Sequence, residues 1–344
     1  KSKTIYFNPA SRVHIQKCLV DKYKWKPKEF TPNGQAKIDE TILANLPYPE
    51  AKRLAEFFLI QKRIGMLAEG AGAWLKKVSP DGRLRHRLNS NNCVSGRATA
   101  TSPNLQQVPS SGSPYGKECR ELFTAPRGWV ICGTDLSGIE LRLLASYLHP
   151  YDGGEYSKQI LEGDIHTYNQ HAAGLATRSQ AKTWVYAVLY GGGDRLIGAI
   201  AGGGAKKGKQ LKDNYDHAVP AFSTLKRNLK TAAKRGHIKA LDGRKLRVRS
   251  EHRCLSQLLQ SAGAIVAKQW VMMTYDKIKE KYGDKVFIMG WIHDEMQIAC
   301  ISKGIAHDVG NIAGAMAQEA GVALGLNIAT EAEYSVGRTW ADTH

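Results

Sequence analysis

Apolar positions along this chain recur with two periods, that of a helix and that of a half-buried strand. The helical period predicts helices at 8–24, 50–77, 140–148, 255–281 and 307–324, and a mostly helical stretch at 155–235 that glycines interrupt at 191–193 and 202–204. The strand-like segments are 129–135, 244–249, the two flanks of His293-Asp294-Glu295, and a pair of strands within 81–90. Prolines and glycines mark the loops between these elements. This mixture predicts an α+β fold.

Acidic residues end or interrupt two of the strand-like segments. The first is Gly133-Thr134-Asp135-Leu136-Ser137-Gly138-Ile139-Glu140-Leu141-Arg142, and the second is Gly290-Trp291-Ile292-His293-Asp294-Glu295-Met296-Gln297-Ile298. An aspartate beside apolar neighbours is costly to bury unless it is paired or binds a metal. Because the order of elements places both segments on one sheet, Asp135 and Asp294 can together hold a pair of Mg²⁺ ions. The alternative is that each aspartate is a turn or cap residue.

A basic and aromatic stripe, formed by Arg178, Lys182, Tyr186 and Tyr190, lies between the two acidic segments. Residues spaced by four lie on one face of an α-helix, so the cations come at its N-terminal end and the rings at its C-terminal end. A triphosphate favours arginine, lysine and a helix N-terminus, and a base favours a flat ring. The glycine run 191–193 then ends the helix. The alternative is an amphipathic helix with an exposed basic end and a core aromatic seam.

The first acidic segment, the stripe and the second acidic segment resemble motifs A, B and C, in that order, of the family A DNA polymerases, the DNA polymerase I group. Their residues are most similar to those of the replicative polymerases of T-seven-type phages. Further segments read like that family, also in order: Tyr6-Phe7-Asn8-Pro9, Gln61-Lys62-Arg63-Ile64-Gly65, Gly96-Arg97-Ala98-Thr99, Pro103-Asn104-Leu105, Gly163-Asp164-Ile165-His166-Thr167, Leu241-Asp242-Gly243-Arg244-Lys245 and Leu258-Leu259-Gln260-Ser261-Ala262-Gly263-Ala264. The resemblance implies a hand-shaped polymerase with an antiparallel palm sheet, helical fingers and a partial helical thumb. The C-terminal portion of the thumb would be 1–85, the palm 86–165 and 255–344, and the fingers 166–254.

The resemblance also implies roles for individual residues. Asp135 and Asp294 would hold two Mg²⁺ ions, for which Mn²⁺ can substitute, and the backbone carbonyl of Leu136 would complete one coordination sphere. Glu295 is a further catalytic candidate. It would either lie next to the metal ligands without binding a metal directly or lie on the primer side. Lys182 would serve both catalysis and binding, since it would contact the β- and γ-phosphates together with Arg178.

The remaining nucleotide contacts follow from the same resemblance. His166 would also reach the phosphates; a polar residue at a helix start is its alternative. Tyr186 would stack near sugar and base, and family members with tyrosine here accept dideoxynucleotides. Glu140 would crowd the sugar 2′ position and bond the Tyr186 hydroxyl, or would be a simple acid at a helix N-terminus. Tyr190 would stack on the template side.

The expected DNA contacts are Arg97, Gln260, Lys62, Arg63, Arg244 and His293. Arg97 and Gln260 would meet minor-groove edges, where acceptors occupy similar places for all base pairs. Lys62, Arg63 and Arg244 would contact phosphates, which position a duplex without reading its sequence. A formal charge of +18 agrees with primer–template DNA and dNTPs as partners.

Composition narrows the setting of the chain. None of the six cysteines forms a C-x-x-C pair, so a zinc ribbon is not expected. The cysteine pattern suits a protein of a reducing cytoplasm, which would be that of the host cell if the protein is phage-encoded. No apolar stretch approaches the roughly 18 residues of a membrane span, so no membrane partner is expected.

Two questions stay open at this stage. The match begins where the upper thumb of the phage enzymes ends, so the chain is either a fragment or one half of a split polymerase. A second chain would then carry the exonuclease and upper thumb, and a processivity factor would act through it. Alternative functions are a polymerase half that only binds DNA without that partner, and a single-subunit RNA polymerase, against which Glu140 and Tyr190-Gly191 argue.

Overall fold

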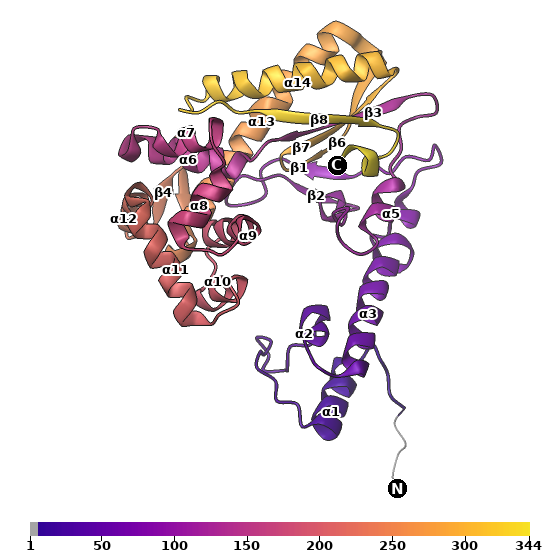
Figure 1. The fold of residues 1–344 in the computed structure, drawn as a ribbon. Helices are drawn as coiled ribbons and strands as arrows, with labels where there is room; N and C mark the ends of the chain where they lie inside the picture. The colour runs from indigo at the N-terminus through magenta and orange to yellow at the C-terminus, as the bar shows by residue number, and fades with distance from the viewer. Residues whose placement is uncertain (1–5) are drawn as a thin grey trace. The chain divides into compact units, whose positions relative to one another are not determined.

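The computed structural model describes residues 6–344, so the first five residues of the predicted thumb segment lie outside it (Figure 1). The chain forms two compact units. The first unit comprises the residues up to Arg87 together with Thr101–Asn104, and the second comprises Leu88–Ala100 and Leu105–His344. Within 6–344, no helix is both long enough and apolar enough to cross a membrane.

The first unit is helical. Its helices are α1 (Arg12–Tyr23), α2 (Glu40–Ala44), α3 (Pro49–Ile64) and α4 (Trp74–Lys77). Ser11 caps α1, and the buried side chains of Ile15 and Leu43 lie in a small core shared by the first three helices. The predicted continuous helix 50–77 is wrong. A π-helical turn, Gly65–Glu69, follows α3, and the chain becomes extended at Gly70, where glycine disfavours helix.

A four-stranded antiparallel sheet with strand order β6-β7-β3-β8 organises the second unit (Figure 1). Its strands are β3 (Val130–Leu136), β6 (Val286–Ile292), β7 (Glu295–Cys300) and β8 (Ala332–Gly337). Every residue of the inner strand β7 is buried. The sheet joins strands that are far apart in sequence, and the α+β prediction is confirmed.

Two long helices, α13 (Cys254–Tyr282) and α14 (Lys303–Ala323), pack on each other beside this sheet (Figure 1). The indole N–H of Trp270 on α13 donates to the carbonyl of Ala313 on α14 at 2.8 Å. Helix α14 packs closely on β8, because a Cβ at Gly310 would lie only 2.3 Å from the ring of Tyr334. The sheet therefore has a closely packed backing on the side of α14.

The helical stretch between the acidic segments forms a large part of the second unit. Its helices are α6 (Ile139–Asp152), α7 (Glu155–Leu161), α8 (Ile165–Ala173), α9 (Arg178–Leu189), α10 (Asp194–Ile200), α11 (Ala205–Ala218) and α12 (Pro220–Ala233). Trp184, Tyr215 and Phe222 are almost fully buried, and Tyr215 contacts both other rings edge to face. This aromatic core holds α9 in place.

Short elements complete the unit and depart most from the prediction. They are α5 (Gly116–Glu121) and two two-stranded sheets, one of β1 (Arg87–Asn89) and β2 (Thr99–Thr101), the other of β4 (His237–Lys239) and β5 (Lys245–Arg247). Of the hairpin predicted at 81–90 around Asp81-Gly82, the structure has only an isolated antiparallel bridge between Val78 and Leu84, and the strand β1 pairs with β2 instead. Strands β4 and β8 were not predicted. Strand β4 is only three residues long and pairs with the nearby β5, whereas β8 pairs with β3, which lies far earlier in the sequence.

Candidate active site

Carboxylates from three strands meet at one edge of the sheet. Asp135, near the end of β3, lies opposite Glu295 on β7 and Glu333 on β8. Asp294 lies in the turn between β6 and β7, and its carbonyl accepts a hydrogen bond from the backbone N–H of Leu136 at 3.0 Å. The structure therefore brings together the two aspartates that the sequence analysis paired.

Burial and like charges raise the pKa of both aspartates. The pKa of Asp135 rises to about 8, through burial and then the carboxylates of Asp294, Glu295, Glu140 and Glu333. The pKa of Asp294 rises to about 6, mainly through burial and Glu140. Ionised carboxylates crowded in this way favour a bound cation, and oxygen donors of this kind suit Mg²⁺. The donor set fits the divalent metal that the sequence predicts.

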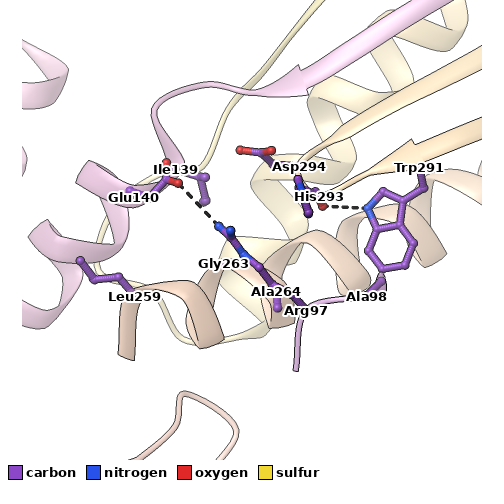
Figure 2. A pocket seen from close by; sticks show the side chains of 10 residues that line it. All are labelled: Arg97, Ala98, Ile139, Glu140, Leu259, Gly263, Ala264, Trp291, His293 and Asp294. Carbon is purple, nitrogen blue, oxygen red and sulfur yellow. Dashed lines mark hydrogen bonds and ion pairs between the residues drawn. The ribbon is translucent and has the colours of Figure 1, made fainter. Parts of the chain in front are cut away.

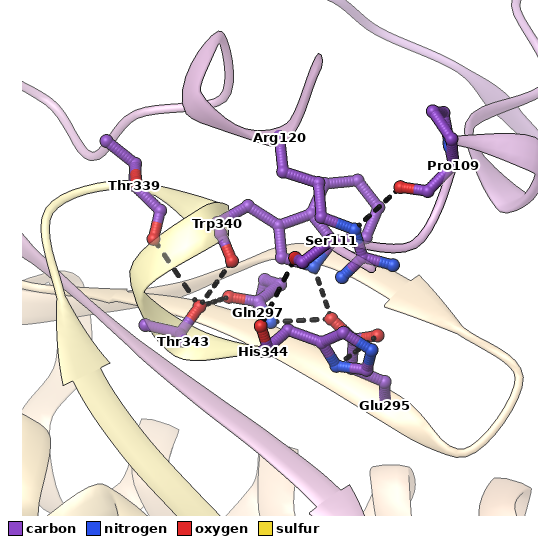
Figure 3. A network of polar contacts seen from close by, with 9 residues as sticks. All are labelled: Pro109, Ser111, Arg120, Glu295, Gln297, Thr339, Trp340, Thr343 and His344. Carbon is purple, nitrogen blue, oxygen red and sulfur yellow. Dashed lines mark hydrogen bonds and ion pairs between the residues drawn. The ribbon is translucent and has the colours of Figure 1, made fainter. Parts of the chain in front are cut away.

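Glu295 lies in a buried polar network at the end of the chain (Figure 3). One carboxylate oxygen accepts from the Gln297 side-chain amide at 2.6 Å and from the indole N–H of Trp340. The other lies 3.2 Å from Nδ1 of His344. Glu295 is thus held by side chains of the segment 340–344 and does not point freely toward solvent.

His344 extends the set of potential metal ligands. Ligand atoms of Asp135, Glu295 and His344 all lie within 4.8 Å of one another, a grouping that does not include Asp294. The sequence does not predict a role for His344 or Trp340, because neither belongs to a motif and each reaches the site only through the folded sheet. Their sole local signal is a capping box that begins the helical turn Trp340–Thr343.

A pocket beside the aspartates is lined by Arg97, Glu140, Trp291, His293 and Asp294, among others (Figure 2). The side chain of Arg97 points toward Glu140, with a nitrogen–oxygen distance of 3.8 Å. The loop around His293 is unusual, since His293 has a left-handed backbone (φ 57°) and its carbonyl accepts from the Trp291 indole at 2.8 Å. Burial and the charge of Arg97 lower the pKa of His293.

The hydrogen-bond partner of Glu140 differs from the prediction. Its carboxylate accepts from the hydroxyl of Tyr190 at 2.8 Å, not from Tyr186. Tyr190 is the C-cap of α9, where the backbone leaves the helix, and this change of direction carries its ring toward the start of α6. Burial and Glu140 together raise the pKa of Tyr190 to about 12.

Helix α9 presents the predicted stripe. Ala181, Trp184, Val185 and Leu189 are its buried face, and Thr177 caps its N-terminus. Arg178 and Lys182 are exposed on the first turns, which agrees both with the predicted phosphate contacts and with the alternative of an amphipathic helix. Tyr186 is partly buried, and burial followed by the carboxylates of Glu140 and Asp294 raises its pKa. The stripe therefore runs from the exposed cations to the acidic site.

A third basic side chain joins Arg178 and Lys182. Burial, followed by the charges of Arg178 and Lys182, lowers the pKa of His166 on α8. Asp164 caps α8 and also accepts from Nε of Arg178 at 2.6 Å. The three predicted phosphate ligands are thus neighbours, and one acidic residue occupies Arg178 in this structure.

The expected DNA contacts divide between the units. In the second unit, the guanidinium of Arg244 lies against Gly96, where an added Cβ would come within 2.6 Å of it, and so lies next to Arg97. Gln260 is partly buried on α13. In the first unit, Lys62 and Arg63 lie in the last turn of α3, and Lys62 is 3.9 Å from Glu40.

Comparisons with known proteins agree over almost the whole chain. Residues 2–342 match the model of the family described as DNA polymerase family A. The DNA-directed DNA polymerases of Enterobacteria phage T3 and Escherichia phage T7 are each 40% identical over 375 residues, covering 99% of this chain and 53% of theirs. The chain thus spans about half the length of these relatives.

A solved structure shares the fold. The POL domain of Pol1 from M. smegmatis, in complex with DNA primer-template and dNTP, superposes with a TM-score of 0.83 at 20% identity. The match covers 97% of this chain and 61% of that one.

Proposed function

Because the chain belongs to DNA polymerase family A, we propose that it is the polymerase portion of a phage-type, template-dependent DNA polymerase, which adds dNTPs to a primer 3′-hydroxyl. The observation that carries this proposal is the meeting of two chain segments at one place. Asp135 and Asp294 lie at the sheet edge, and Glu140, which lines a pocket together with Asp294, accepts a hydrogen bond from Tyr190 at the end of α9. A phosphate-binding helix and a metal-binding carboxylate pair thus face the same space.

The subdomains of the proposal follow the sequence boundaries. The C-terminal portion of the thumb would be 1–85, the palm 86–165 and 255–344, and the fingers 166–254. Two features support this division: the main segment of the first compact unit ends at Arg87, and both proposed palm segments contribute strands to one sheet.

We place two Mg²⁺ ions on Asp135, Asp294 and the backbone carbonyl of Leu136, with Mn²⁺ as a substitute. A divalent cation here supplies positive charge that lowers the pKa of the primer hydroxyl and offsets the charge of the phosphates. Glu295, held by Gln297 and Trp340, contributes fixed negative charge next to Asp135. Its position is compatible with a role behind the metals or toward the primer.

The stripe on α9 would hold the incoming nucleotide. Arg178 would exchange Asp164 for a phosphate oxygen, while Lys182 and His166 contact the same group. Lys182 is in addition the candidate for stabilising charge on the leaving phosphates. The aromatic end of the stripe would then lie next to the sugar and base.

The sugar pocket would select deoxynucleotides. Tyr190 donates to Glu140 and so restrains its carboxylate, which would stand where a ribose 2′-hydroxyl has to fit. Tyr186 would stack on the sugar and base, with its hydroxyl near the acidic site. Tyr190 would in addition present its ring on the template side.

Each unit contributes its own proposed DNA contacts. Arg97, Gln260 and His293 would face base edges and the primer terminus, while Arg244, Lys62 and Arg63 would contact phosphates. The phage relatives are nearly twice as long as the matched region. A second polypeptide with an exonuclease and upper thumb, and a processivity factor acting through it in the host cytoplasm, are therefore included in the proposal, and copurification tests them.

Primer extension by the purified chain tests the central claim. We expect Mg²⁺-dependent addition of dNTPs that follows the template and disappears in EDTA, with the Asp135→Asn variant as the inactive control. Binding of primer–template without extension would mean that the chain is only a DNA-binding half. Preferred incorporation of ribonucleotides would make it an RNA polymerase.

A further inference from the structure

Arg142 is a buried cation on α6, seven positions after Asp135, and its side chain is only 9% exposed. Its guanidinium donates three hydrogen bonds. Nε donates to the carbonyl of Ser137 at 2.9 Å, Nη1 to the carbonyl of Ala329 at 2.6 Å, and Nη2 to the carboxylate of Glu331 at 2.6 Å. Two of these acceptors lie nearly 190 positions away in sequence.

The acceptors belong to the two segments that flank the acidic edge. Ser137 follows Leu136 in the turn from β3 to α6, and Ala329 and Glu331 precede β8. The backbone N–H of Ser137 also donates to the carbonyl of Glu331 at 2.9 Å. Arg142 therefore ties the turn after Asp135 to the start of the neighbouring strand.

The same turn is held from its other side by the hydrogen bond from the Leu136 N–H to the carbonyl of Asp294. Its glycine, Gly138, has a left-handed backbone (φ 57°), so the turn departs from regular structure and needs side-chain partners. A guanidinium can donate along several fixed directions at once, whereas a lysine ammonium is a compact point charge on a flexible stem. Burying this charge is tolerable only because all three contacts are made.

We propose that Arg142 is a positioning residue, whose three contacts hold the Leu136–Ser137 turn so that the Leu136 carbonyl and the Asp135 carboxylate keep the geometry a divalent cation requires. The inference rests on the metal site of the proposed function. Mg²⁺ demands near-ideal octahedral geometry, so a small shift of one oxygen donor weakens binding. Residues that orient metal ligands in this way commonly change metal affinity about 10- to 100-fold when they are replaced.

Arg142→Lys distinguishes a positioning role from a general contribution to stability. It keeps the positive charge but loses the planar guanidinium that donates along several fixed directions. We expect Mn²⁺ affinity of the whole chain with primer–template, measured without dNTP by electron paramagnetic resonance of free Mn²⁺, to fall about tenfold. The Mg²⁺ concentration for half-maximal primer extension should rise by a similar factor. The KM for dNTP at saturating Mg²⁺ should change less than about twofold, since α9 is untouched.

Trp270→Phe is the matched control. It removes another buried hydrogen bond within the same unit, to Ala313, and lowers thermal stability, but it should leave Mn²⁺ affinity at the parent value. A folded Arg142→Lys variant that binds Mn²⁺ like the parent would overturn the inference. So would an equal loss of Mn²⁺ affinity in Trp270→Phe.

Glu331→Gln keeps the test decisive if Arg142→Lys does not fold. It retains an oxygen acceptor but removes the charge at one of the three contacts, so we expect about a threefold loss of Mn²⁺ affinity. Parent affinity in this variant would count against the proposal. A parent chain that neither binds Mn²⁺ nor extends primers would instead contradict the proposed function.

Discussion

The hydroxyl of Tyr190 donates a hydrogen bond to the carboxylate of Glu140 at 2.8 Å, across 50 positions of sequence. Arg97 lies 3.8 Å from the same carboxylate oxygen. The acid at the start of α6 is therefore held by the end of α9 and by the loop that carries Arg97. Two partners restrain this carboxylate. Under the proposed function it forms the wall of the sugar pocket.

The first prediction concerns this wall. Glu140→Ala should relax discrimination against ribonucleotides by roughly tenfold or more, because the space for a 2′-hydroxyl opens. Tyr190→Phe should relax it less, because the carboxylate remains but loses one restraint. Competition between paired ribo- and deoxynucleotides in primer extension measures both. Parent discrimination in Glu140→Ala would show that this residue is not the gate.

Either aspartate should be essential for chemistry but not for binding DNA. Asp135→Asn or Asp294→Asn should lower incorporation roughly 1,000-fold or more, since several kcal/mol of metal-derived stabilisation are lost. Affinity for primer–template should stay within about threefold of the parent, because the basic contacts remain. Single-turnover extension and fluorescence anisotropy give the two values. Near-parental extension by either variant in Mg²⁺ would refute the metal assignment.

Tyr186 should determine the response to chain terminators. Burial and the carboxylates of Glu140 and Asp294 raise the pKa of its phenol, and under the proposed function its hydroxyl takes the place of a missing 3′-hydroxyl. We expect efficient dideoxynucleotide incorporation by the parent, and a fall of about tenfold in the dideoxy/deoxy ratio for Tyr186→Phe. An unchanged ratio, with only a small change in melting temperature, would mean that the tyrosine is a packing residue.

His166 predicts a pH dependence of phosphate binding. Burial, followed by the charges of Arg178 and Lys182, lowers the pKa of His166 from the ordinary histidine value, and the ring gains a proton as the pH falls. Folding thereby disfavours the protonated ring. The folded protein therefore loses stability as the pH falls through the pKa of His166. A bound triphosphate reverses the preference, because it favours the charged ring.

The measurement is calorimetric titration of inorganic triphosphate, without metal, at about pH 5.5 and about pH 8. The parent should gain about tenfold more affinity on acidification than His166→Gln does. Comparing the two proteins cancels the protonation of the ligand itself. The same gain in both would remove His166 from the phosphate site.

Duplex affinity should depend steeply on salt. The chain carries a formal charge of +18, and each phosphate contact releases condensed counterions. We expect primer–template affinity to fall more than about tenfold between roughly 50 and 200 mM salt. Arg244→Gln should reduce the slope of log affinity against log salt concentration by about one, because one phosphate contact is lost. A flat salt dependence would mean that the charge serves another partner.

Local patterns predicted much of the fold and of the candidate site. The acidic residues at the end of β3 and in the β6–β7 turn follow apolar runs, and the stripe on α9 follows from a spacing of four. Such features depend on neighbours within a few positions, so periodicity reveals them. The break after α3 was missed, because a single π turn and Gly70 outweighed an otherwise helical pattern.

By itself, the sequence determined which residue types and which helices and strands could take part, since backbone propensity and side-chain periodicity act locally. Only the tertiary structure decided who contacts whom: Tyr190 rather than Tyr186 at Glu140, Trp340 and His344 at Glu295, and Glu331 at Arg142. These contacts span 45 to 189 positions along the chain. Their geometry depends on sheet register and on the packing of buried polar groups, for which a short stretch of sequence carries no signal.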